Sequence, residues 1–229
     1  MRYIAVIILS LLSVNFSQSQ INELGVFVGG SNLIGDVGAT NYISPNAPSL
    51  GILYKWNKSA RHSWRISLIY SDLKAYDDKS DDPRRIQRDY SFDANLLEIA
   101  AGMEFTFLDF NLHAGRKVAT PYLYSGVSVA RHRDYYFLNG LQTAVGGGSS
   151  LAFGIPMAIG FKTNFLENFI LGFEIGTRFT FSDNIDGSYP DDQTLQPYRF
   201  GNQNNNDWYT FTGFTLTYTF GENPCYCPN

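Results

Sequence analysis

The feature that most constrains the fold of this chain is a period-two alternation of large apolar residues with small or polar ones. In the segment 50–56 every even position is large and apolar, whereas the odd positions include Gly51 and Lys55. In another segment the odd positions from 97 to 105 are apolar, and the opposite face carries Glu98 and Glu104. Successive side chains of a β-strand point to opposite faces, so the pattern predicts strands with one apolar face. The expected strands are 22–32, 50–56, 64–70, 95–105, 120–131, 151–163, 168–181 and 208–220.

The connections between these segments alternate in length. Long polar connections are expected at 33–49, 72–91, 131–150 and 182–207, and shorter ones at 57–61, 108–119 and 164–167. Long outer loops and short periplasmic turns are typical of outer-membrane barrels, whose tilted strands cross the bilayer. We therefore predict an all-β fold, an eight-stranded antiparallel transmembrane β-barrel of the size of OmpA or OmpX, with both termini in the periplasm. A soluble β-sandwich is the alternative, and it explains neither the loop pattern nor the apolar strand faces.

The amino terminus has the order of a secretory signal peptide. Arg2 follows Met1, residues 4–12 are mostly apolar, and small residues stand at Ser17 and Ser19. The apolar stretch is shorter than the roughly 20 residues that a transmembrane helix needs, so cleavage is expected. The expected organisation is a signal peptide at 1–19, an outer-membrane barrel at 20–221 and a periplasmic cysteine-containing tail at 222–229.

The composition fits strands that face lipid. Charged residues make up 17% of the chain, against about 25% in an average soluble domain, and aromatic residues make up 16%. A net charge of -4 argues against nucleic acid as a partner, because phosphate binding requires a clustered basic face. Aromatic residues favour both membrane interfaces. Those expected there are Trp56, Trp64, Tyr218 and Phe220 on the periplasmic side, and Tyr70 and Trp208 on the outer side.

Charged residues occur on the strand faces that point away from the apolar side. An eight-stranded barrel has an interior just wide enough for side chains to fill, and buried charges must be paired. We therefore expect a charge-paired plug, and a catalytic or ion-conducting lumen is the alternative. The expected lumen charge network comprises Arg65, Glu98, Glu104, Glu174 and Arg178, with Lys162 on the same face.

Two acidic groups lie in the second and fourth outer loops. They are Asp77, Asp78, Asp81 and Asp82, and Asp183, Asp186, Asp191 and Asp192. Neither has the spacing of an EF-hand, and arginines follow the first group, so solvated loops are expected rather than metal sites. No motif for nucleophilic catalysis joins a histidine to a serine and a carboxylate, so neither an enzyme activity nor a cofactor is expected.

The two cysteines of the chain, Cys225 and Cys227, both stand in the tail. A framework of disulfides is therefore not expected to hold the fold. In an oxidising periplasm these thiols can form a local disulfide or a bond to a partner, which is favoured over metal binding by two thiols alone. A role in assembly is a further hypothesis for this pair.

Several blocks of the mature chain have a recognisable residue order. Residues 22–32, with Leu24, Val26 and Val28, are followed by Gly-Asp-Val-Gly at 35–38. Further blocks are 120–124, 174–183, 207–213 and 216–221. Together they resemble PorG, a barrel family of the type IX secretion system of Bacteroidota, and the first block and 174–183 are the most specific. The family has no enzymatic motif, so no catalytic residue follows from the resemblance.

The resemblance implies an outer-membrane component that associates with the periplasmic ring of a lipoprotein and a partner protein. In gliding relatives the same machine supports motility. Contacts with such a ring would lie on the periplasmic side, where the second turn is the longest. The candidate partner-contacting residues are Phe110, Leu112, Arg116 and Lys117, and outer-membrane lipids are the other expected partner. A small porin or a surface-binding barrel of the OmpA or OmpX kind is the alternative function.

Overall fold

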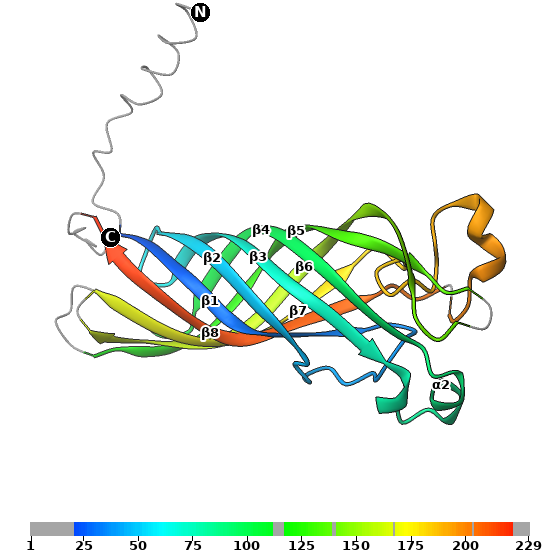
Figure 1. The fold of residues 1–229 in the computed structure, drawn as a ribbon. Helices are drawn as coiled ribbons and strands as arrows, with labels where there is room; N and C mark the ends of the chain where they lie inside the picture. The colour runs from blue at the N-terminus through cyan, green and yellow to red at the C-terminus, as the bar shows by residue number, and fades with distance from the viewer. Residues whose placement is uncertain (1–20, 112–116, 139–140, 167, 203, 222–229) are drawn as a thin grey trace, which may run out of the picture.

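The computed structural model describes residues 21–111, 117–138, 141–166, 168–202 and 204–221. These residues form a closed barrel of eight antiparallel strands, in which each strand pairs with its neighbours in sequence and the last pairs with the first (Figure 1). The strands are β1 (Ile21–Ile34), β2 (Ala47–Asn57), β3 (His62–Tyr76), β4 (Ser91–Thr106), β5 (Ala119–Tyr136), β6 (Val145–Leu166), β7 (Phe169–Thr180) and β8 (Trp208–Phe220).

The predicted all-β, eight-stranded fold is therefore confirmed. Seven of the eight predicted segments lie within the observed strands, and the segment 168–181 exceeds β7 by one residue at each end. The expected signal peptide and the cysteine-containing tail fall on residues 1–20 and 222–229, which lie outside the described part of the chain.

Closure of the barrel removes the free edges of the sheet. Val26 of β1 pairs with Ile52 of β2 on one side and with Leu216 of β8 on the other. A sheet edge in hydrocarbon would leave unpaired N–H and C=O groups that no solvent could satisfy. Pairing of β1 with β8 from Asn22 to Ile34 therefore makes this sheet compatible with a lipid environment.

The connections lie at two ends of the barrel. β1 begins and β8 ends at the same end as the connections 58–61, 107–118 and 167–168, whereas α2 (Pro83–Arg88) lies at the other end (Figure 1). That other end also carries the short helices η1 (Asp77–Lys79) and η2 (Gln193–Tyr198). We call this end the helix-bearing end and the first one the terminal end.

The prediction of a long loop at 131–150 is wrong. β5 and β6 continue as a paired hairpin, with Tyr135 opposite Gly146 and Tyr136 opposite Val145, so only 137–144 connects them. The glycine- and serine-rich residues 146–150 show no apolar alternation, although backbone pairing requires none. The connection 107–118 is longer than this one, so the alternation of loop lengths is less regular than the sequence suggested.

The outer surface of the barrel is apolar along every strand. On β6, exposed side chains from Leu151 to Phe161 alternate with buried ones, and Ile159 is 59% exposed. At about 3.3 Å per residue and a tilt of about 40°, this stretch covers a height of about 25 Å, the apolar band of outer-membrane barrels. The exposed apolar residues of the other strands include Leu24, Val26, Ile52, Ile66, Leu68, Ile99, Val127, Phe173, Phe214 and Leu216.

The interior has the opposite composition, and it divides into two halves. Toward the helix-bearing end the buried side chains are mainly apolar and include Phe27, Leu53, Ile69, Leu73, Leu96, Tyr209 and Phe211. Toward the terminal end they are mainly polar or charged. In the described ranges no helix is long and apolar enough to cross a membrane.

A closed barrel with this register should migrate differently on a gel before and after boiling. Every strand has two partners, so detergent at room temperature should leave the barrel folded and compact. The measurement is gel mobility of the protein extracted from membranes, with and without heating. Identical mobility in both samples, together with recovery in the soluble fraction, would contradict the membrane barrel.

Candidate functional site

The charged interior is the most unusual chemical feature of the barrel. Alternation along each strand places one residue in two inside, and four cations and four carboxylates there are buried. They are Lys55, Arg65, Lys162 and Arg178, and Glu23, Glu98, Glu104 and Glu174. Their formal charges sum to zero, so the interior can accommodate them if each one has a partner.

Glu104 on β4 joins two lysines from strands on either side. Lys55 Nζ on β2 lies 2.7 Å from Glu104 Oε2, and Lys162 Nζ on β6 lies 2.6 Å from Glu104 Oε1. Lys162 also lies 4.7 Å from the ring centroid of Phe110. This carboxylate therefore links β2, β4 and β6 across the interior.

Glu174 on β7 receives a fork of two hydrogen bonds from Arg65 on β3. Arg65 Nη1 donates to Glu174 Oε2 at 2.6 Å, and Nη2 donates to Oε1 at 2.9 Å. The hydroxyl of Tyr122 donates to the same carboxylate at 2.7 Å. The Arg65 guanidinium lies over the ring of Tyr124 at 4.7 Å. A two-pronged contact of this kind fixes the orientation of both side chains as well as their separation.

Glu98 and Arg178 form a second pair, closer to the helix-bearing end. Arg178 Nε and Nη2 donate to Glu98 over 3.1–3.2 Å, and Tyr209 donates its hydroxyl to Glu98 Oε2 at 2.6 Å. Arg178 Nη1 donates to the carbonyl of Gly176 at 2.8 Å, and the guanidinium lies over Phe211. Buried Glu23 accepts hydrogen bonds from Asn57 and Thr217, at 2.8 and 2.9 Å.

Two inward glycines make room for these networks. A Cβ at Gly176 would lie 2.7 Å from Arg178 Nη1, and one at Gly160 would collide with the ring of Tyr122. With both positions occupied by glycine, the large side chains can span the barrel and meet carboxylates on distant strands. The result is a filled, charge-balanced interior rather than an open lumen, since an eight-stranded barrel leaves no further space.

The structure brings together the residues expected in the lumen network. Arg65 meets Glu174, Glu98 meets Arg178, and Glu104 meets Lys162. The sequence reasoning did not single out Lys55, Glu23, Tyr122 and Tyr209. Alternation alone would place Tyr122 on the inner face, because Leu123 beside it is outward, but alternation cannot show which carboxylate a tyrosine meets across the barrel.

Removing one partner of a buried pair should be far more damaging than removing one partner of an exposed pair. We expect Glu174→Gln to lower the free energy of unfolding by about 3–5 kcal/mol, because it leaves Arg65 buried without a counter-charge. The matched control Asp93→Asn breaks the exposed Lys74–Asp93 pair and should leave stability nearly unchanged, because solvent screens that pair. The measurement is urea unfolding in lipid vesicles, followed by tryptophan fluorescence. Equal stability of the two variants would contradict the proposed role of the network.

The loops at the helix-bearing end form a packed cap. Asp77 is buried, lies 2.7 Å from Arg88 Nε, and accepts a hydrogen bond from the backbone N–H of Gly38 at 2.8 Å. The rings of Tyr90 and Phe137 stack at 4.3 Å, and Phe200 packs edge-on against both. These contacts join four different loops, so the cap is a continuous layer over the barrel.

The expectation of solvated acidic loops is wrong for two residues. Asp77 and Asp186 are fully buried, because their carboxylates accept backbone N–H groups from neighbouring loops. Asp78, Asp81, Asp191 and Asp192 are exposed, as expected, whereas Asp82 and Asp183 are half-buried. In the described ranges no group of three or more His, Cys, Asp or Glu side chains could hold a metal ion.

Three aspartates of the cap share a poorly hydrated environment. Burial raises the pKa of Asp183 to about 7, with repulsion from Asp186 and Asp36 adding to the effect. Burial also raises the pKa of Asp186 and that of Asp207, and Asp186 repels Asp207 further. Asp186 accepts the N–H of Val37 at 3.1 Å, which ties the fourth loop to the first. Asp207 accepts the N–H of Ile185 at 2.9 Å, which joins two parts of the fourth loop.

This cap should loosen as the pH rises. When the cap is closed, the raised pKa lets Asp183 keep its proton up to about pH 7. When the cap opens into water, the same carboxyl group loses its proton above about pH 4. The closed cap therefore becomes less stable, relative to the open one, as the pH rises from about 4 to about 7. Hydrogen exchange of the Val37 and Ile185 amides, corrected for intrinsic rates, should therefore report less protection at pH 8 than at pH 5. Asp183→Asn should remove part of this dependence. Greater protection at pH 8 than at pH 5 in the unaltered protein would contradict the prediction that the cap loosens as the pH rises.

The proposed partner-contacting turn is only partly described. Leu112 and Arg116 lie outside the described residues, and Lys117 is exposed. Phe110 is 6% exposed and its ring lies beneath Lys162, so it closes the terminal end of the interior and does not fit the expected surface contact. The exposed side chains beside it are Leu108 and Asp109, and Asp109 pairs with Arg61 of the neighbouring turn.

Several solved structures resemble this chain in part of their arrangement. Ail of Yersinia pestis, solved with the heparin analogue sucrose octasulfate, is 11% identical with a TM-score of 0.48, over 89% of this chain and 100% of that one. Neisserial surface protein A is 14% identical with a TM-score of 0.46, over 88% and 95%. A major outer membrane protein of Thermus thermophilus is 10% identical with a TM-score of 0.48, over 89% and 100%.

The sequence itself matches one family. The model of the family described as "Domain of unknown function (DUF6089)" matches residues 2–229, so the chain belongs to that family. No curated protein matches the chain in sequence.

Proposed function

We propose that this member of the DUF6089 family is a non-enzymatic outer-membrane barrel that serves the type IX protein secretion machinery by associating with its periplasmic ring. The sequence resemblance to PorG suggests the machine. The observation that supports the proposal most directly is the filled interior. A barrel without an open lumen must act through the surfaces at its two ends, where it can bind other proteins.

The apolar exterior supports the membrane location. Large side chains such as Val127 and Ile159 are more than half exposed on the outside, whereas charged residues such as Arg65 are buried inside. In water this arrangement would expose far more apolar area than soluble monomers tolerate. In a bilayer the same surface faces hydrocarbon, and the aromatic residues near the terminal end, such as Trp56 and Trp64, can lie at the lipid headgroups.

A ring in the periplasm would meet the terminal end of the barrel. The exposed groups there include Leu108, which is 56% exposed, Lys117, and the ion pair between Arg61 and Asp109. Protein interfaces commonly place apolar side chains at the centre, where they supply buried area, and charged residues at the rim, where they fix the orientation of the partner. The charged rim would set the orientation of the ring, and Leu108 would anchor it.

Paired substitutions at opposite ends of the barrel test this proposal. We expect Leu108→Glu with Lys117→Glu to weaken ring binding about 30-fold, equivalent to about 2 kcal/mol, and so to reduce secreted cargo. The matched control is Ile86→Glu on α2, which alters an apolar side chain of similar exposure, 48%, at the helix-bearing end. Cargo in the medium and barrel in the outer membrane would both be measured. Normal secretion by the first variant and loss by the second, at normal membrane levels, would overturn the proposal.

A small porin or surface-binding barrel is the second candidate. The ordered cap at the helix-bearing end favours surface binding, because packed loops present a fixed surface. Conductance across planar bilayers separates the porin from the other two functions. Reproducible single-channel steps from the purified barrel would favour the porin, whereas a silent barrel fits a plugged interior.

A further inference from the structure

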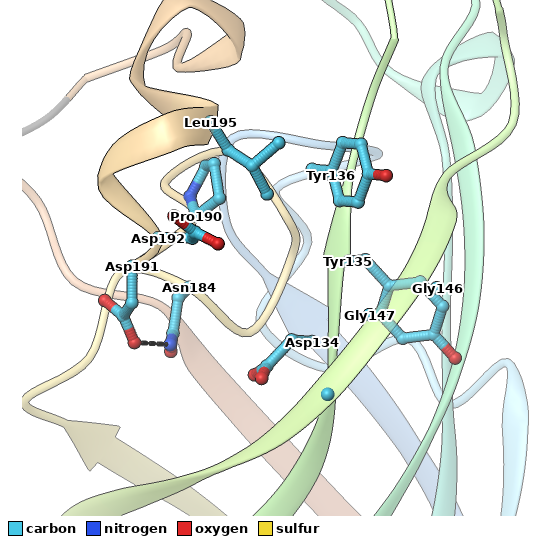
Figure 2. Close-up of a pocket in the computed structure, with 11 residues that line it drawn as sticks. Asp134, Tyr135, Tyr136, Gly146, Gly147, Asn184, Pro190, Asp191, Asp192 and Leu195 are labelled. Carbon is cyan, nitrogen blue, oxygen red and sulfur yellow. Dashed lines mark hydrogen bonds between the residues drawn. The ribbon is translucent and has the colours of Figure 1, made fainter.

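A pocket of about 400 Å³ opens at the helix-bearing end, on the side away from the proposed ring contact. Figure 2 shows it between the β5–β6 hairpin and the β7–β8 loop, with Tyr135 and Tyr136 on one side and Pro190 and Leu195 on the other. The residues come from segments far apart in sequence, and the cap described above holds those segments together.

The charged side chains that line this pocket are all acidic. They are Asp134 on β5 and Asp191 and Asp192 on the β7–β8 loop. Within the described part of the chain no ion pair within 4.0 Å involves these three carboxylates, although the buried imidazole of His132 interacts electrostatically with Asp134 and Asp191. The nearby Arg199 is engaged elsewhere, because it donates to the carbonyl of Pro190 and stacks on Tyr189. Three carboxylates without a counter-charge attract a cation.

Buried acceptors inside the pocket lack partners. Asn184 is 8% exposed, and its amide nitrogen donates to Asp191 at 2.5 Å, as Figure 2 shows. Its Oδ1 is buried and accepts no hydrogen bond, and neither does the buried Oδ1 of Asp134. A buried acceptor that loses water without gaining a donor destabilises the folded form. A ligand rich in N–H donors would satisfy both oxygens.

The hairpin wall keeps the Asp134 carboxylate accessible. Gly146, Gly147 and Gly148 lie along β6 opposite the end of β5. A Cβ at Gly148 would lie 3.3 Å from Asp134 Oδ2, so a larger residue there would crowd that carboxylate. With glycines in the wall, no β6 side chain from 146 to 148 fills the space beside the Asp134 carboxylate.

We propose that this pocket binds a guanidinium group, as carried by an arginine side chain of a peptide outside the cell. A guanidinium is planar, offers five N–H donors and no acceptor, and stacks on aromatic rings. The pocket offers the complementary groups, which are carboxylate and amide acceptors beside tyrosine residues. A metal ion is disfavoured, because the described residues hold no group of three ligating side chains close enough to bind one. This binding does not depend on the secretion role, which concerns the terminal end.

Binding of two isosteric probes to the full barrel in detergent micelles tests the proposal. N-acetyl-arginine amide should bind saturably at millimolar concentration or below, and N-acetyl-citrulline amide, which lacks the charge, should bind at least tenfold more weakly. Asp134→Asn with Asp191→Asn should weaken arginine binding at least tenfold. The control Asp81→Asn, which alters an exposed carboxylate on the β3–β4 loop, should leave it unchanged. Heat-dependent gel mobility would verify that each variant is folded.

Several results would overturn the assignment. They are equal binding of the two probes, no saturation by arginine amide, unchanged affinity in the double variant, or displacement of arginine amide by stoichiometric calcium. Because the variants lie at the helix-bearing end, their secretion of cargo should be normal. Failure of this proposal would therefore leave the proposed ring contact standing, and failure of the ring contact would leave this one standing.

Discussion

The structure depends on one constraint, which is that charges enclosed by a narrow barrel must neutralise one another. Strands that face lipid on one side cannot send a charged side chain into the middle of the apolar band, so the charged side chains there, such as Arg65, Glu98 and Glu174, point inside. Arg131 is exposed at the edge of this band, opposite Leu151. Arg65, Arg178 and the two lysines then reach carboxylates on other strands. The same contacts fill the space that a channel would need. Charge neutrality and closure of the lumen are therefore two results of one arrangement.

This constraint also separates the two ends of the molecule. The charge networks fill the interior between the two ends, so a ligand reaches each end from its own side of the barrel. The terminal end presents Leu108 among charged groups, whereas the helix-bearing end presents an acidic pocket above a packed cap. The pH dependence of the cap arises from Asp183 and its neighbours, which lie near the pocket but are distinct from its carboxylates.

Much of the barrel could be predicted from the sequence, because alternation reports directly which side chains share a face. All eight strands were found, and Arg65, Glu98, Glu104, Glu174 and Arg178 were placed on the inner face. Alternation does not show which side chains on opposite strands meet inside the barrel. It could not pair Tyr122 with Glu174 or reveal the part played by Lys55, since those contacts depend on barrel radius and stagger. It also missed the hairpin at 145–150, where β5 and β6 pair through their backbones without an apolar alternation. Nor could it show that Phe110, which was expected to contact a partner, is buried beneath Lys162.

The placement of the charge partners has a consequence for how such a barrel assembles. Arg65 and Glu174 are 109 residues apart, and the carboxylate of Glu104 joins alternate rather than adjacent strands. No hairpin of two neighbouring strands can form either contact, so these pairs arise only when the sheet curls round on itself. Contacts between sites so far apart in sequence are slow to form. Until β1 meets β8, the inner face must stay hydrated, because unpaired charges would otherwise face hydrocarbon. Burial of these charges is therefore linked to the curling of the whole sheet into a barrel, and not to the formation of any single hairpin.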